Sequence, residues 1–334
     1  MRRILLACAA SLVLYGIAFG CLLDRPLTLG RLRAQINANL ALGTAITGPK
    51  LVILAGSNGP YSHRCEMIGP IVGRPCINAG VAVGVGLDYL FARWKPLLRP
   101  GDVVYLPLEE TQYARERTTS ELGPDAAIML RHDRATLWTM PPHRQLAALF
   151  ASDLRAGIMS LLEMALLDSD FHDPRAAATG STNAWGDHIG HTIALSAASR
   201  SALLHEQPFH ATAAQISGGY GTELVRQFVR WAAARDIRVI GGLPTGFADS
   251  PIGTDSLAAI RAVYLGAGFL ELPNRSRYPR SDFFDSPDHL NEAAQIRHSF
   301  AIAQALRCMM GGTVSRGADP PVRLVATHAP ATPQ

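Results

Sequence analysis

The stretch LVILAGSNGPYS, residues 51–62, decides how the rest of this sequence is interpreted. Its first six residues are apolar or small, a pattern typical of a short buried strand. Ser57, Asn58 and Gly59 then close the run with residues that favour tight turns. The stretch therefore predicts a buried strand whose carboxyl end carries a serine.

Other short apolar runs closed by Gly or Pro follow this strand, at residues 76–80, 102–108, 238–244 and 269–273. Helical stretches lie between them, at residues 86–98, 142–167 and 222–236. Strands that alternate with helices predict an α/β fold in which helices cover both faces of a parallel sheet. Ligands of such sheets bind outside the carboxyl ends of the strands, so Ser57 is expected at the functional edge.

Length and composition favour one large domain, because 334 residues with 48% hydrophobic content can bury a sizeable core. The net charge of +4 falls close to neutral once Arg2 and Arg3 are set aside, which argues against a nucleic-acid partner. We expect a leader at 1–25, a helix and linker at 26–50, the α/β domain at 51–310 with an insertion at about 110–220, and a disordered tail at 311–334.

The N-terminus is interpreted as a targeting segment. Residues 4–23 carry no charge, follow two arginines and are long enough, as a helix, to span a bilayer core. An uncleaved signal anchor in the bacterial inner membrane is the main prediction, with a periplasmic body. A cleaved leader with secretion, or a lipoprotein processed at Cys21, are the alternatives. Each of them places residues 51–310 outside the cytoplasm.

The cysteines beyond the leader leave two interpretations open. Cys65 and Cys76 can form a disulfide in an oxidising compartment, or these two and Cys308 can be small core residues. There is no Cys-x-x-Cys pair, and we expect neither a metal site nor a cofactor.

The hydroxyl of Ser57 needs a base, and that base needs a third group to orient it. The best candidates lie far along the chain, in YPRSDFFDSPDHLNEAAQ at residues 278–295. Asp285 and His289 share one loop before a helix start there. The carboxylate can hold one ring nitrogen while the other faces the serine. Asp288, next to the histidine, is expected to point elsewhere.

Three blocks of this sequence resemble the SGNH, or GDSL-like, hydrolase superfamily: AGSN around Ser57, NAGVAVGVG at 78–86 and FFDSPDHLN at 283–291. The resemblance implies a three-layer, flavodoxin-like α/β fold and a Ser57–His289–Asp285 triad. It also implies an oxyanion hole built from the amides of Ser57 and Gly84, with Gly80 as the alternative to Gly84.

The sequence departs from that family at the third block, which normally supplies an oxyanion asparagine. VYLPLEETQY at 104–113 offers Glu109 and Glu110 but no asparagine, so Asn58 is the candidate replacement. We interpret the two glutamates as a charged loop or as ligands of sugar hydroxyls. The departure also supports an alternative function, a non-catalytic protein of the same fold that binds polysaccharide or a synthase subunit.

A narrower resemblance is to membrane-anchored periplasmic members linked to exopolysaccharide O-acetylation, including the SGNH-like protein of bacterial cellulose-synthase operons. It rests on GSN, PLE, D-x-x-x-HLN and an N-x-x-GD element formed by Asn183, Gly186 and Asp187. Asn183 and Asp187 thereby become candidate substrate-binding residues. Exopolysaccharide synthase or acyltransferase subunits become candidate partners.

The resulting functional prediction is an extracytoplasmic serine esterase or acyltransferase that acts on O-acetyl groups of an exopolysaccharide, with cellulose as one candidate glycan. The non-catalytic accessory protein is the first alternative. A lipid esterase, suggested by the membrane anchor, is the second.

Overall fold

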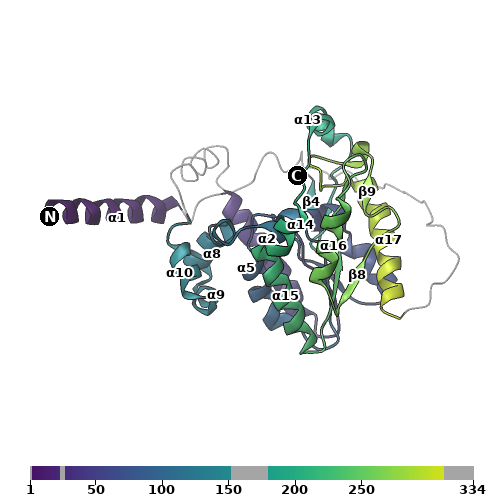
Figure 1. Cartoon of the computed structure of the whole chain (residues 1–334), viewed down its shortest axis with the longest axis horizontal. Coiled ribbons are helices and arrows are strands. Elements are labelled where there is room, and N and C mark those ends of the chain that lie inside the picture. Colours follow the sequence, from purple (N-terminus) through teal and green to yellow (C-terminus); the bar gives the residue numbers. More distant parts are fainter. Residues whose placement is uncertain (1, 23–26, 152–179, 312–334) are drawn as a thin grey trace, which may run out of the picture.

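The computed structural model describes residues 2–22, 27–151 and 180–311 (Figure 1). Its centre is a five-stranded parallel sheet in the order β2-β1-β3-β6-β8. The strands are β1 (Leu51–Ile53), β2 (Cys76–Asn78), β3 (Val103–Leu106), β6 (Arg238–Gly242) and β8 (Gly268–Leu270). Counting only these strands, the order is that of flavodoxin-like sheets. The predicted mixed α/β fold with a parallel sheet is confirmed.

Alternate residues along the strands face two separate hydrophobic clusters, one on each face of the sheet. Val52 and Val104 belong to the larger cluster, whereas Leu51 and Val103 belong to the smaller one. The larger cluster includes side chains from α2 (Leu27–Ala45), α5 (Leu87–Trp94), α15 (Tyr220–Ala233) and α16 (Thr254–Val263). The smaller one includes side chains from α4 (Cys65–Val72) and α17 (Glu292–Met309). Helices therefore cover both faces, with α15 and α16 across the sheet from α17 (Figure 1).

The chain between β3 and α15 corresponds to the predicted insertion. Up to residue 151 it contains the short helices α6 (Glu110–Ala114), α7 (Arg117–Glu121), α8 (Pro124–His132), α9 (Arg134–Thr139) and α10 (Pro142–Ala148). After residue 179 it continues with β4 (Ser181–Thr182), β5 (His188–Ile189), η2 (Leu195–Ala198), α13 (Arg200–His205) and α14 (Ala213–Gly218). The long helix expected at 142–167 ends at Ala148 as α10, and its remainder from residue 152 lies outside the described residues.

Smaller elements near the carboxyl edge of the sheet are α3 (Asn58–Ser62), the pair β7 (Gly246–Phe247) and β9 (Arg277–Tyr278), and η3 (Arg280–Asp282). The short helix η1 (Lys95–Leu97) lies at the opposite edge, where the Leu97 carbonyl accepts a hydrogen bond from Lys50 just before β1.

At the N-terminus, α1 (Arg2–Leu22) spans most of the apolar run that was predicted as a membrane anchor. Within the part of the chain that the structure describes, no helix meets the length and apolarity needed to cross a membrane. The predicted disordered tail falls almost wholly outside the described residues.

A disulfide joins Cys65 at the start of α4 to Cys76 at the start of β2, with their Cα atoms 5.0 Å apart. This decides between the two interpretations of the cysteines. Cys308, the third one, is free and exposed rather than a core residue.

Candidate active site

Ser57 lies just beyond the carboxyl end of β1, between the strand and the first turn of α3. Three glycines let the backbone pack tightly around it. A Cβ atom on Gly80 would lie 2.8 Å from the Gly56 carbonyl oxygen and 2.9 Å from the Gly59 Cα atom. Such distances are shorter than carbon side chains tolerate, so the loop after β2 touches the serine turn only because these positions lack side chains.

The three predicted triad side chains are in contact. His289 Nε2 lies 2.8 Å from Ser57 Oγ, and His289 Nδ1 lies 2.6 Å from Asp285 Oδ1. Both distances are within hydrogen-bond range. One ring nitrogen faces the serine hydroxyl and the other faces the carboxylate, as in a serine–histidine–aspartate triad. The predicted convergence of one hydroxyl, one imidazole and one carboxylate at the sheet edge is therefore confirmed.

The surroundings favour an ionised Asp285 and a fixed imidazole. Burial alone would raise the pKa of Asp285, but the hydrogen bond from His289 and the neighbouring histidines bring this pKa below its usual value. The Tyr61 ring stacks on the His289 ring, with centroids 4.0 Å apart and planes 9° apart. His188 lies over Tyr61 at 4.2 Å, so a column of rings limits rotation of the imidazole.

The oxyanion candidates are placed differently from one another. The Ser57 amide donates no hydrogen bond to a backbone carbonyl among the described residues. The Gly80 amide is directed to Asn78 Oδ1 at 3.4 Å, and the Gly84 carbonyl accepts a 3.1 Å hydrogen bond from Arg115. The described contacts bring Gly80, not Gly84, against the serine turn.

Asn58 was predicted to replace the missing asparagine, but its side chain holds the scaffold together instead. Its Nδ2 donates a 2.7 Å hydrogen bond to the Pro107 carbonyl, and its buried Oδ1 has no hydrogen-bond partner within the described parts of the chain. The amide therefore ties the serine turn to the end of β3. We correct its assignment from oxyanion donor to a residue that positions the turn.

Glu109 and Glu110 begin α6 and are both 7% exposed, so the interpretation of a solvated charged loop is wrong. Both line a cavity of about 280 Å³ at the carboxyl edge of the sheet. His210 Nδ1 lies 2.8 Å from Glu110 Oε2, and His210 Nε2 lies 2.8 Å from Ser250 Oγ. Asp288, beside the triad histidine, lines the same cavity. The cavity thus lies beside the loop that carries the triad histidine, and the carboxyl groups of Glu109, Glu110, Glu206 and Asp288 are among its lining.

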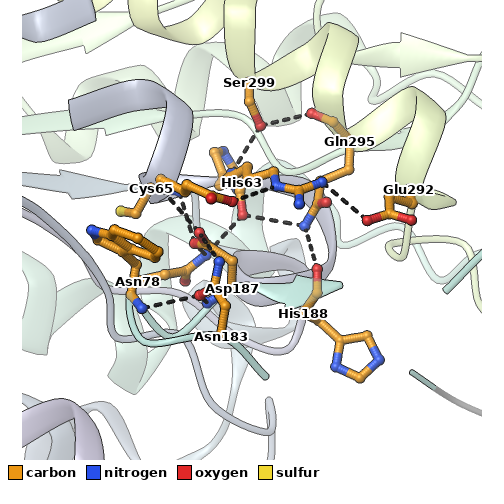
Figure 2. Close-up of polar contacts among 12 residues, drawn as sticks. His63, Cys65, Asn78, Asn183, Asp187, His188, Glu292, Gln295 and Ser299 are labelled. Carbon is orange, nitrogen blue, oxygen red and sulfur yellow. Dashed lines mark hydrogen bonds and ion pairs between the residues drawn. The ribbon is translucent and has the colours of Figure 1, made fainter. Parts of the chain in front are cut away.

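Asn183 and Asp187 lie in the β4–β5 hairpin and serve a buried network (Figure 2). Asp187 Oδ1 accepts hydrogen bonds from the Cys65 amide at 2.7 Å and Asn78 Nδ2 at 3.1 Å. Its Oδ2 accepts from the Glu66 amide at 3.0 Å and Asn183 Nδ2 at 3.1 Å. Protein donors therefore occupy both carboxylate oxygens. These hydrogen bonds hold the hairpin against α4 and β2. We therefore correct the role of Asn183 and Asp187 from substrate binding to a structural one.

Several residues at the site were not predicted from the sequence, namely Tyr61, His210 and Arg277. Tyr61 follows Ser57 by four residues, which places it one helical turn away and could have indicated a contact near the nucleophile. No local pattern marks His210 or Arg277, because only the tertiary fold brings them to the cavity. Among the described residues, no group of three His, Cys, Asp or Glu side chains could hold a metal ion.

Comparison with known proteins adds little to this geometry. No protein-family model and no curated protein matches the chain. Among solved structures, the crystal structure of the Bacillus subtilis protein YxiM is similar over 79% of this chain, with 12% sequence identity and a TM-score of 0.39. This chain covers 58% of the length of that protein.

Proposed function

We propose that this protein is an extracytoplasmic serine esterase or acyltransferase of the SGNH type that acts on O-acetyl groups of an exopolysaccharide. The observation that carries the proposal is the continuous Ser57–His289–Asp285 contact, with both hydrogen bonds shorter than 3 Å. A hydroxyl in this arrangement loses its proton to the imidazole as it attacks, which converts a weak nucleophile into an effective one.

The proposed reaction has two halves. Ser57 Oγ attacks the ester carbonyl while its proton passes to His289 Nε2, and the carbonyl oxygen becomes an oxyanion. The tetrahedral intermediate then expels the sugar alkoxide, which takes the proton from His289, and the acetyl group remains on Ser57. A water molecule or a second sugar hydroxyl reverses these steps on the acetyl-enzyme. Asp285 holds Nδ1 and stabilises the imidazolium throughout.

The neighbouring cavity supports a small acyl group on a polar carrier. The carboxyl groups that line the cavity of about 280 Å³ suit a polar ligand better than a long acyl chain. Buried carboxylates such as Glu110 accept hydrogen bonds from sugar hydroxyls, and Arg277 in the same wall can donate them. These features favour an acetylated sugar over a lipid ester.

The proposed location rests on the disulfide. A Cys65–Cys76 bridge persists in the periplasm or outside the cell, where thiols are not kept reduced. We propose residues 4–23 as the segment that directs export and, if uncleaved, anchors the protein in the inner membrane beside exopolysaccharide synthase or acyltransferase subunits.

The test is acetate release from an aryl acetate by the purified protein, compared with Ser57→Ala. We expect the variant to lose roughly 10⁴- to 10⁶-fold in rate, as triad removal does elsewhere. Ser201→Ala, an exposed serine on α13, is the matched control and should keep full activity. A fluorophosphonate probe should label the wild type and not Ser57→Ala. Equal hydrolysis by wild type and Ser57→Ala would exclude the mechanism. Glycan binding without turnover or labelling would favour a non-catalytic accessory protein.

A further inference from the structure

The side chain of Glu109 has an unusual environment at the start of α6. It is 7% exposed, and its Oε1 atom is fully buried without a hydrogen-bond partner among the described residues. Its own backbone amide donates a 3.1 Å hydrogen bond to Gln112 Oε1, which fixes this first turn of the helix. Buried polar atoms almost always have partners, so an unsatisfied carboxyl oxygen in a cavity wall indicates a partner that is supplied from outside.

The unsatisfied oxygen lies against the backbone that carries the nucleophile. A Cβ atom on Gly56 would be 2.5 Å from Glu109 Oε1, and Gly56 immediately precedes Ser57. The space that a side chain would fill at Gly56 is therefore occupied by the carboxyl of Glu109. Glu109 is also one of the residues that line the cavity next to Asp288.

The charge around Glu109 favours its neutral form. Burial is the main cause that raises the pKa of Glu109 to about 8, and the negative charge of Asp288 raises it further. The hydrogen bond from the Asn58 backbone amide to the Glu109 carboxyl, the Arg115 guanidinium and the Thr111 side chain act in the opposite direction and are weaker. Burial raises the pKa of Asp288 as well, to about 6, but His289 and Arg277 stabilise its charged form. Burial and the nearby negative charge therefore favour the protonated form of Glu109 near neutral pH.

A neutral carboxyl next to the nucleophile suits the chemistry, whereas an ionised one would oppose it. When Ser57 attacks an ester, negative charge collects on the carbonyl oxygen, and a carboxylate at this place would repel it. A carboxylic acid can instead donate its O–H to that oxygen, as buried neutral acids do in other oxyanion holes. The Asn58 side-chain amide is already engaged by Pro107, so it does not replace this donor.

We propose that Glu109 is a catalytic residue that donates a hydrogen bond from its protonated carboxyl to the oxyanion formed at Ser57. This inference rests on the proposed esterase or acyltransferase function. The proton stays on Glu109 throughout, since the serine proton travels through His289. Glu109 supplies the donor, and the Ser57 amide supplies a second one.

The test compares Glu109→Gln and Glu109→Ala with the wild type in kcat and KM for an aryl acetate, from about pH 6 to about pH 10. In the wild type, kcat should fall as pH rises through about 8, because Glu109 then loses its proton. Glutamine keeps a donor that does not ionise, so Glu109→Gln should stay within about tenfold of the wild type and lose this alkaline decline. Glu109→Ala should lose about 100- to 1,000-fold in kcat with little change in KM.

The control is Glu116→Gln, an exposed glutamate beyond the same helix, which should keep both the rate and the alkaline decline. A readout independent of turnover is the infrared carbonyl band of a neutral carboxylic acid at pH 7, which Glu109→Gln should abolish. An unchanged alkaline decline in Glu109→Gln, or a loss as large as that in Glu109→Ala, would overturn the inference while leaving the esterase intact. A wild type that neither hydrolyses esters nor reacts with the fluorophosphonate would remove both proposals.

Discussion

The substitution Asp187→Asn isolates the network that holds the β4–β5 hairpin onto the domain. Each carboxylate oxygen of Asp187 accepts two hydrogen bonds, so the amide loses two acceptor sites whichever way it is turned. Asn183 cannot relieve the clash by turning over, because its Oδ1 already accepts from the amides of Trp185 and Asp187 at 3.0 Å. Two buried donors therefore face an NH₂ group.

The expected cost follows from these contacts. A hydrogen bond to a charged acceptor contributes about 1.5–3 kcal/mol, so losing two removes about 3–6 kcal/mol. Burial raises the pKa of Asp187, because removing its charge from water costs free energy. The neutral amide of asparagine avoids this desolvation cost, which offsets part of the loss. We expect a net loss of about 2–4 kcal/mol, or a fall in Tm of about 4–8 °C for a chain of this size.

The assay is thermal and urea unfolding at pH 7, with Asp249→Asn as the matched control. The Asp249 side chain is 60% exposed and pairs with Arg280 at 2.7 Å, so its loss should change stability by less than about 0.5 kcal/mol. If Asp187→Asn unfolds within 0.5 kcal/mol of the wild type (about the size of the control effect), the network does not hold the hairpin as argued.

Two further predictions concern stability. Replacing Cys65 and Cys76 together by serine should lower the free energy of unfolding by about 3 kcal/mol, because the bridge closes a loop with a sequence separation of 11. In urea unfolding, a reductant should lower the stability of the wild type to that of the variant. If the wild type refolds in reductant with unchanged stability, the bridge does not form as described. Burial lowers the pKa of His63 to about 4, so the unfolded chain binds this proton more readily than the folded protein does below about pH 6.5. The contribution of neutral His63 to the free energy of unfolding should therefore be fully present above about pH 6.5 and fall by about 3 kcal/mol as the pH drops to about 4. The His63→Gln variant should lose less stability over this pH range. If the wild type and the variant lose stability equally with falling pH, His63 is not the cause of the loss.

Much of the sheet was predictable from local rules, whereas the triad contact was expected from the partners that a serine nucleophile needs and from the resemblance to SGNH hydrolases. Short β-branched runs closed by Gly or Pro predicted β1, β2 and β3 to within a few residues. Parallel strands end at one edge, which predicted the place of Ser57 but not that of the loop carrying His289. The four-residue spacing between Asp285 and His289 is compatible with their 2.6 Å contact because both lie in one turn of a single loop.

The roles of Glu109 and Asp187 were not predictable from local pattern. Two consecutive glutamates after a strand are usually exposed, and their burial here depends on the distant segments that carry His210 and Arg277. The N-x-x-GD element was recognised as a unit, but its role depends on Gly186. A Cβ atom there would lie 2.1 Å from the Asn78 carbonyl oxygen, so this glycine lets the hairpin lie directly on β2. Only the tertiary contact shows that the element is structural.

The environment of Glu109 connects stability to function. A buried carboxyl oxygen without a partner costs roughly 1–3 kcal/mol in the free protein, and apolar replacement at that position would avoid the cost. The fold instead accommodates the carboxyl, with a glycine at position 56 to make room for it. A hydrogen-bonding group that is unsatisfied in the free protein and satisfied by the oxyanion interacts more strongly with the transition state than with the resting site. That difference, rather than tighter binding of the ester, is what lowers a reaction barrier.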